Sequence, residues 1–304
     1  MSEPVRVRVP ATSANLGPAF DCAGLALTRH DHLEFSVVGE GLEVLLAGEG
    51  AATLPRNGNH LVVRAFRAAC DQLDWRPTGL RLVAENGIPQ GRGMGSSAAA
   101  VVAGVLGAWG LCPDVDEIDV GAVLRLVSEI EGHPDNVAAC LLGGATLSWT
   151  TPEGARARRL DVDPRVTPVV LVPPGVLSTH LARGLLPAVV PHADAAHAAG
   201  RSALLVLALT REPDLLLDAT EDRLHQRQRA GAMPESLAVV DRLREQGIPA
   251  VVSGAGPSIL VLADAPETAT TVQALTPADW TVLPLEVDVR GARVDRGTVE
   301  VSSR

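Results

Sequence analysis

Three glycines in front of an alanine-rich run constrain this 304-residue chain more than any other feature. Gly91, Gly93 and Gly95 stand at alternate positions in "GIPQGRGMGSSAAAVVAGVLGAWG" (87–110), and two serines follow them directly. Glycine at alternate positions is costly in a helix or a strand, because it loses backbone entropy and buries no side chain. The alanines and valines after the serines predict a helix over 96–110. The glycines therefore indicate a loop that must approach another group closely.

The order of strand, glycine loop and helix start is typical of a phosphate-binding site. Segment 79–89 ("GLRLVAENGIP") predicts the strand, and backbone N–H groups of such a loop, with the helix N-terminus, favour anions. A Walker A loop is excluded because GK[ST] is absent and the chain has no lysine. A dinucleotide fingerprint fits poorly, because its third glycine is missing. A plain turn in which Ser96 or Ser97 caps the helix remains the alternative.

Composition and charge exclude several classes of protein. A net charge of −10 argues against a nucleic-acid partner, which needs a basic face. The sequence shows neither a signal peptide at its start nor a charge-free run long enough to span a membrane, so we expect a cytoplasmic protein without a membrane partner. The four cysteines lack metal-site spacing, and we expect them to be reduced and structural.

The pattern of expected elements predicts an α+β fold in two layers with two subdomains. Alternation predicts a strand at 5–10, apolar runs predict strands at 167–174 and 249–264 (the latter with a glycine turn inside), and a last strand is expected at 280–294. Helical periods are expected at 58–74, 116–132, 192–210 and 221–246. The polar segment 151–165 marks the boundary, so we expect domains at 1–158 and 159–304.

Three segments together carry a resemblance to a known family. "PATSANLGPAFDCAGLAL" (10–27), the glycine loop and "VVSGAGPSILVLAD" (251–264) resemble the three motifs of the GHMP kinases, and the first of them, with "EGHPDNVAACLLGG" (131–144), resembles the homoserine kinase branch. The resemblance implies a ribosomal-protein-like N-terminal subdomain and a ferredoxin-like C-terminal one. It further implies ATP with Mg²⁺, a homodimer, and phosphorylation of the L-homoserine hydroxyl in threonine biosynthesis.

The resemblance assigns a set of residues to the substrate. Asp21 suits an ammonium or hydroxyl group, and arginine suits bidentate capture of a carboxylate. The expected substrate residues are Asn15, Asp21, His133, Asn136, Thr179, Arg183 and Arg229. We expect Asn136, Asp21 and Arg183 to act in catalysis by positioning and charge stabilisation, because asparagine cannot be a general base and phosphoryl transfer does not require one.

The resemblance also assigns the nucleotide and the metal ion. The expected ATP-binding residues are Asn59, Pro89, Gln90, Gly91, Arg92, Gly93, Met94, Gly95, Ser96, Ser97, Ala98 and Ala99. Mg²⁺ is expected on Ser97 and Glu129, because it binds oxygen ligands together with phosphates. Glu131, two residues further on, is the alternative carboxylate, but we expect it to be a solvated helix end.

Departures from the family pattern and rival functions stay open at this point. Ala19 stands where glycine is usual, so a left-handed backbone there would be strained. A kinase for L-threonine or mevalonate and a family member that binds ligands without catalysis remain alternatives.

Overall fold

The first of two sheets organises the N-terminal half. The computed structural model describes residues 3–263 and 268–296. The first sheet has the order β11-β1-β2-β4-β3, with the hairpin of β5 and β6 attached to β2, and only β3 and β4 pair in parallel. Its strands are β1 (Val5–Ala14), β2 (Ala23–Val37), β3 (Gly41–Gly48), β4 (Gly79–Asn86), β5 (Ala145–Thr151), β6 (Gly154–Leu160) and β11 (Arg293–Asp295).

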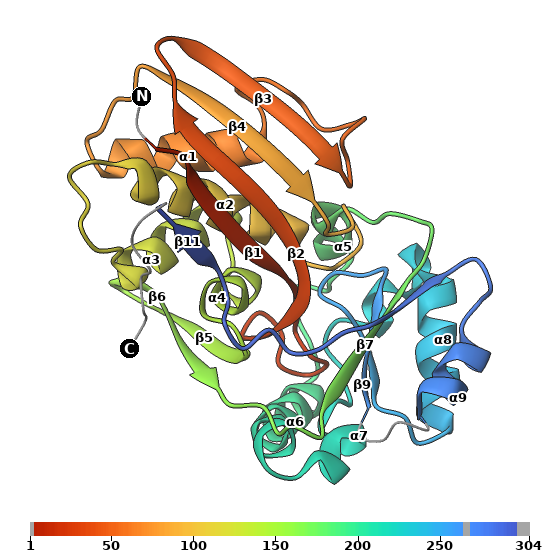
Figure 1. Ribbon diagram of the computed structural model, residues 1–304. Coiled ribbons are helices and arrows are strands. Elements are labelled where there is room, and N and C mark those ends of the chain that lie inside the picture. The colour runs from red at the N-terminus through yellow and green to blue at the C-terminus, as the bar shows by residue number, and fades with distance from the viewer. Residues whose placement is uncertain (1–2, 264–267, 297–304) are drawn as a thin grey trace.

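One face of this sheet is covered by helices, as Figure 1 shows. They are α1 (Leu61–Gln72), α2 (Ser96–Leu111), α3 (Val120–Glu131) and α4 (Asp135–Leu142). Helix α2 is buried on nearly all sides, which explains its run of small apolar residues, and it packs against β1, α1, α3 and α4. The glycine loop precedes α2, so this central helix fixes the position of the loop.

The second sheet is antiparallel, with the order β10-β7-β9-β8. Its strands are β7 (Thr167–Val172), β8 (Ala250–Val252), β9 (Ile259–Ala263) and β10 (Thr281–Pro284). Alternate residues of β7 enter different cores, because side chains of a strand alternate between faces. Val169 and Leu171 join the core under α8, whereas Val170 and Val172 join the main core with residues of α6.

The helices of the second half lie around this sheet (Figure 1). They are α5 (Thr179–Gly184), α6 (His192–Thr210), α7 (Leu216–Ala219), α8 (Pro234–Glu245) and α9 (Thr268–Leu275), with short 3₁₀ turns at Pro213–Leu215 and Arg227–Ala232. The helical period expected over 221–246 is therefore divided into a 3₁₀ turn and α8. Pro234 occupies the first turn of α8, where it needs no hydrogen-bond partner for a backbone N–H.

The C-terminal segment returns to the first sheet. The single strand expected at 280–294 is two strands, β10 in the second sheet and β11 beside β1. Between them, buried Asp288 accepts hydrogen bonds from Arg290 N and Gly291 N and pairs with His30 of β2 at 2.6 Å. The boundary expected after residue 158 falls inside β6, which ends at Leu160. The two halves therefore share a core and a returning strand.

Candidate functional site

The glycine loop presents its backbone at the start of α2. Gly91, Gly93 and Gly95 all have positive φ, at 64°, 74° and 69°. Gly95 is the N-cap of α2, and no side chain caps the helix. The expected caps, Ser96 and Ser97, are instead the first two helical residues. The N–H groups of the first helical turn therefore remain available to an anion, and the helix dipole favours one there.

The third glycine motif supports this loop from the second sheet. Ser253 Oγ lies 2.6 Å from the carbonyl oxygen of Gly93 and 2.8 Å from Ser13 Oγ. A Cβ added to Gly93 would lie 2.3 Å from the carbonyl oxygen of Ser253. The segment 253–258 thus reaches the phosphate-type loop through a backbone approach that only glycine permits.

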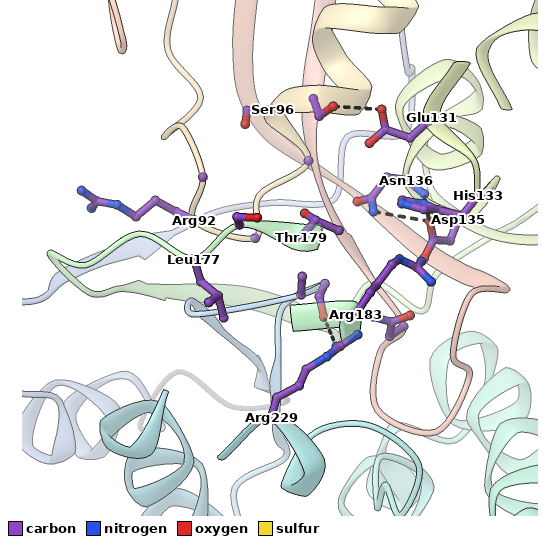
Figure 2. Close-up of a pocket in the computed structure, with 18 residues that line it drawn as sticks. Arg92, Ser96, Glu131, His133, Asp135, Asn136, Leu177, Thr179, Arg183 and Arg229 are labelled. Carbon is purple, nitrogen blue, oxygen red and sulfur yellow. Dashed lines mark hydrogen bonds and ion pairs between the residues drawn. The ribbon is translucent and has the colours of Figure 1, made fainter. Parts of the chain in front are cut away.

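One pocket gathers the motifs from both halves of the chain. Figure 2 shows the 18 residues that line it, with the loop and Ser96 on one side and Arg183 and Arg229 on the other. The lining residues are Asn15, Gly91, Arg92, Gly93, Gly95, Ser96, Ser97, Glu131, His133, Asp135, Asn136, Leu177, Ser178, Thr179, Arg183, Arg229, Gly254 and Ala255. Twelve of these were expected from the sequence. Asp135, Leu177 and Ser178 were not assigned to the site, and the short apolar and turn-like segment around 177–178 carries no chemical signal.

The acidic residue beside Ser97 is Glu131, which corrects the expected pairing with Glu129. Ser97 Oγ donates to Glu131 Oε2 at 2.9 Å, whereas Glu129 is exposed and outside the pocket. Side chains two positions apart on an α-helix differ by about 200° in direction, so Glu129 and Glu131 point to opposite faces of α3. The buried residues Leu124 and Val127 stand seven and four positions before Glu131. This helical spacing places Glu131 on the buried face of α3, and it was the sequence signal that could have identified Glu131.

Burial and the neighbouring negative charge of Asp135 destabilise the ionised carboxylate of Glu131, which a bound cation would stabilise. Burial raises its pKa, and the nearby Asp135 carboxylate raises it further, while the hydrogen bond from Ser97 opposes both. One carboxylate and one hydroxyl, with room for phosphate oxygens beside them, form a donor set that suits Mg²⁺. No cluster of three or more histidine, cysteine, aspartate or glutamate side chains with metal-site geometry occurs among residues 3–263 and 268–296.

A buried aspartate orients the two polar residues beside it. Asp135 is 2% exposed, and its Oδ1 accepts from the backbone N–H of Asn136 at 2.7 Å and contacts His133 Nδ1 at 2.8 Å. Burial lowers the pKa of His133, but its hydrogen bond to Asp135 and the charge of that carboxylate outweigh burial and raise it overall. Thr12 Oγ1 donates to Asn136 Oδ1 at 2.7 Å, and Asn136 Nδ2 lies 3.4 Å from Asp135 Oδ1, so both ends of the Asn136 amide are held.

Arg183, which lines the pocket, forms a bidentate ion pair with Asp21. Arg183 Nη1 and Nη2 lie 3.0 and 2.6 Å from the two oxygens of Asp21, and this contact raises the pKa of Arg183. Asp21 itself is held in the left-handed region with φ 57°, and its N–H donates to Asn15 Oδ1 at 3.0 Å. Asn15 Nδ2 donates in turn to the carbonyl of Gly254 at 2.9 Å. Asn15, Asp21 and Arg183 are thus linked to one another, although Asp21 itself does not line the pocket.

Ala19, the departure in this loop, does not disturb its backbone. It is buried and is not among the residues with positive φ, which here are Asn15, Leu16, Gly17 and Asp21. A glycine at position 19 is therefore not required by the conformation that the loop adopts.

Arg229 is a buried cation without a carboxylate hydrogen-bonded to it among the described residues. It is 1% exposed, and its guanidinium donates to the carbonyls of Ala182 (3.2 Å) and Gly254 (3.3 Å) and to His225 Nδ1 (3.0 Å). Burial lowers the pKa of Arg229, and the nearby Arg183 lowers it further. Such a charge is costly unless an anion pairs with it, so this end of the pocket suits a carboxylate.

A second pocket adjoins the loop between β2, β4 and α1. Its lining residues are Asp31, Leu33, Leu54, His60, Leu61, Val62, Asn86, Gln90, Ser96, Ser97 and Ala100. Of the expected nucleotide residues, Gln90, Ser96 and Ser97 lie here, whereas exposed Asn59 lines neither pocket and its neighbour His60 does. Pro89, Met94, Ala98 and Ala99 are buried behind the loop and line neither pocket.

Two further expectations concern cysteines and membranes. Cys22, Cys70, Cys112 and Cys140 are all free thiols, as expected. Among the described residues, no helix combines the length and apolar character needed to cross a membrane.

Comparisons with known proteins agree with the geometry. Family models for the GHMP kinases N terminal domain and the GHMP kinases C terminal region match residues 60–144 and 204–275. The chain is 57% identical over 291 residues to homoserine kinase of Streptomyces coelicolor, covering 95% of this chain and 94% of that protein. It is 45% identical to homoserine kinase of Rhodococcus erythropolis, with 97% of each chain covered.

Solved structures give the same picture. A putative homoserine kinase from Listeria monocytogenes superposes with a TM-score of 0.76 at 31% identity, over 96% of this chain and 99% of that one. A homoserine kinase from Cytophaga hutchinsonii superposes with a TM-score of 0.83 at 24% identity, over 97% and 98%, and at that identity supports the fold alone.

Proposed function

The chain belongs to the GHMP kinase family, among its homoserine kinases, and from this premise we propose that it transfers the γ-phosphoryl group of ATP to the side-chain hydroxyl of L-homoserine. The product is O-phospho-L-homoserine, which serves threonine biosynthesis. One observation carries the proposal: a single pocket joins an anion-binding loop at a helix N-terminus to groups of both charges suited to an amino acid.

The phosphates of ATP bind the loop between Gly91 and Ser97. Three left-handed glycines shape the loop that leads into the uncapped N-terminus of α2, and N–H groups in such a loop and helix start favour anions. Arg92 also lines the pocket, but its guanidinium extends away from the other lining residues and donates to the carbonyl oxygen of Pro173 at 2.7 Å (Figure 2). The nucleoside lies in the adjoining pocket, because Ser96 and Ser97 line both spaces and its walls include apolar Leu33 and Val62.

The ammonium and carboxylate groups of homoserine replace the contact that Asp21 and Arg183 make with each other. The ammonium group binds Asp21, and the carboxylate binds Arg183 and the buried Arg229. A zwitterion can replace this ion pair without leaving either charge unpaired, whereas a substrate that lacks an ammonium group, such as mevalonate, leaves Asp21 uncompensated. This distinction favours homoserine over mevalonate, although L-threonine carries the same two charges.

Glu131 and Ser97 would hold Mg²⁺ together with ATP oxygens, with Glu131 in the role first expected of Glu129. When bound, the ion neutralises charge on the transferring phosphate and orients it. Glu131 contributes the carboxylate and Ser97 the hydroxyl, and their 2.9 Å contact keeps both oxygens on one side of the pocket.

Catalysis by this chain rests on positioning and on charge. Thr12 donates to Asn136 Oδ1 and Asn136 Nδ2 contacts Asp135, which leaves one N–H of Nδ2 to donate to the substrate hydroxyl oxygen. As an amide, Asn136 cannot remove the hydroxyl proton. Asp135 holds the ring of His133 through Nδ1, and Nε2, which has no hydrogen-bond partner among the described residues, is the nitrogen for a polar substrate contact. Thr179, at the start of α5, closes the opposite wall of the pocket. Transfer through a loose transition state needs this alignment more than a strong base.

We also infer a cytoplasmic homodimer, as in the family resemblance, with the two domains dividing near the end of β6. Sedimentation of the purified chain at several concentrations tests the dimer. A single species with the mass of one chain at all concentrations would refute it.

An ADP-release assay with Mg-ATP tests the function when L-homoserine, L-threonine and mevalonate are compared in parallel. We expect kcat/KM for homoserine to exceed the other two by at least about tenfold, which corresponds to about 1.4 kcal/mol of discrimination. Equal or higher turnover of threonine or mevalonate would assign another substrate. ATP binding without turnover of any of them would favour a ligand-binding role.

A further inference from the structure

A histidine outside the pocket connects two parts of the substrate site. His225 is completely buried, and its ring packs against Phe20 with the centroids 5.2 Å apart. Its Nε2 lies 2.8 Å from the carbonyl oxygen of Gly17, in the loop that carries Asn15. Its Nδ1 lies 3.0 Å from Nη1 of Arg229. One ring therefore joins the first loop to the arginine that faces the substrate carboxylate.

Only one form of the imidazole satisfies both contacts. A guanidinium group has donors and no acceptor, so Nδ1 must be unprotonated to receive the hydrogen bond from Arg229. A carbonyl oxygen only accepts, so Nε2 must carry the proton that is donated to Gly17. His225 is therefore neutral. Burial lowers the pKa of His225. The negative charge of Asp222, whose Oδ1 lies 3.8 Å from Nε2, raises it, but the effect of burial is larger.

These contacts leave one side of the Arg229 guanidinium for a ligand. Nε donates to Ala182, and Nη1 donates to His225 and Gly254. Nη2 has no hydrogen-bond acceptor within residues 3–263 and 268–296, and Arg229 lines the pocket. The ring of Phe20 lies 5.6 Å from the guanidinium carbon and closes another side. The direction of the free N–H groups is thus fixed by the acceptors on Nε and Nη1, and His225 is the only side chain among them.

We propose that His225 is a positioning residue for the substrate carboxylate: its Nδ1 holds Arg229 so that Nη2 faces the pocket, and its Nε2–H fixes the neighbouring loop at Gly17. The inference rests on the proposed function, because it assigns the carboxylate of homoserine to Arg229. The contact between His225 and Arg229 concerns binding of the amino acid and not of the phosphates of ATP. A change at His225 should therefore alter KM for homoserine.

Two replacements separate the two nitrogens. In His225→Asn, the amide oxygen stands near the place of Nδ1, so the acceptor for Arg229 is kept and the donor to Gly17 is lost. In His225→Gln, the amide N–H₂ reaches toward Gly17, and the acceptor for Arg229 is lost. His32→Asn, on the exposed face of the first sheet, is the matched control. Thermal unfolding of all variants measures the general cost of altering a buried side chain.

We expect His225→Gln to raise KM for L-homoserine by about tenfold, the effect of one lost buried hydrogen bond to a charged group. KM for ATP should stay within about twofold. His225→Asn should keep KM for homoserine within about threefold, and His32→Asn should change neither value. Similar KM for homoserine in His225→Gln and wild type, or equal increases in His225→Gln and His225→Asn, would overturn the proposal.

A spectroscopic measurement on the wild-type protein does not depend on the variants folding. The ¹⁵N shifts of the His225 ring should show a protonated Nε2 and an unprotonated Nδ1. A proton on Nδ1 would overturn the positioning role even if homoserine is turned over. A wild-type chain with the expected shifts but no turnover of homoserine would refute the proposed function and keep the contact with Arg229.

Discussion

A side chain added at Gly95 would meet Thr12, whose hydroxyl group holds the Asn136 amide. A Cβ there would lie 1.9 Å from Thr12 Oγ1 and 3.2 Å from Asn136 Oδ1, and the backbone has φ 69°. In Gly95→Ala, a left-handed alanine costs about 1–2 kcal/mol. Thr12 must also rotate away, which loses its hydrogen bond to Asn136 and about 0.5–1.5 kcal/mol more. The total destabilisation should be about 1.5–3.5 kcal/mol.

Gly91→Ala is the control, because it has nearly the same φ of 64° but its Cβ would meet only Val176, at 3.6 Å. We expect it to show the backbone cost alone, about 1–2 kcal/mol. Urea unfolding gives the stabilities, and steady-state kinetics should show a larger loss of kcat/KM for Gly95→Ala, because the Asn136 amide loses its orientation. Equal stabilities and equal kinetics for the two variants would refute the reasoning about Thr12.

Two further predictions concern the carboxylates of Glu131 and Asp31. Glu131→Gln should raise the Mg²⁺ concentration for half-maximal rate by about tenfold or more, whereas Glu129→Gln on the opposite helix face should leave it within about twofold, and equal effects would contradict the assignment. Burial raises the pKa of Asp31 to about 6, while hydrogen bonds from Ile88 N and Gly87 N oppose the shift. Because this folded pKa lies above the unfolded value of about 4, the carboxyl group contributes less to stability as pH rises from about 4 to 6. Asp31→Asn should therefore gain about 1–3 kcal/mol relative to wild type between pH 4 and 7 in urea unfolding, and a constant difference would contradict the raised pKa.

The sequence predicted the features that depend on local chemistry. The alternate glycines required a loop with a special backbone, and all three have positive φ. The run of small apolar residues predicted α2, which begins at Ser96 as expected. The motif residues from three distant segments meet in one pocket, and the family resemblance was needed to select Arg183 and Arg229 from many arginines.

Features that depend on packing were not predicted. The choice between Glu129 and Glu131 depends on which face of α3 packs against α2, and motif position alone does not show this, although Leu124 and Val127 mark that face. The last expected strand divides between two sheets because the segment around Asp288 crosses back to β2, a long-range contact without a local signal. His225 had no signal either, because its role comes from Gly17, more than 200 residues away.

The identity of the phosphorylated atom tests the central claim most directly. Incubation of the chain with Mg-ATP and L-homoserine, followed by ³¹P NMR, should give one new phosphomonoester signal coupled to the γ-methylene protons of the amino acid. That result is expected if Arg183 and Arg229 hold the carboxylate and Asn136 directs the hydroxyl toward the loop. An acyl phosphate, or inorganic phosphate as the only product, would contradict this arrangement of the substrate.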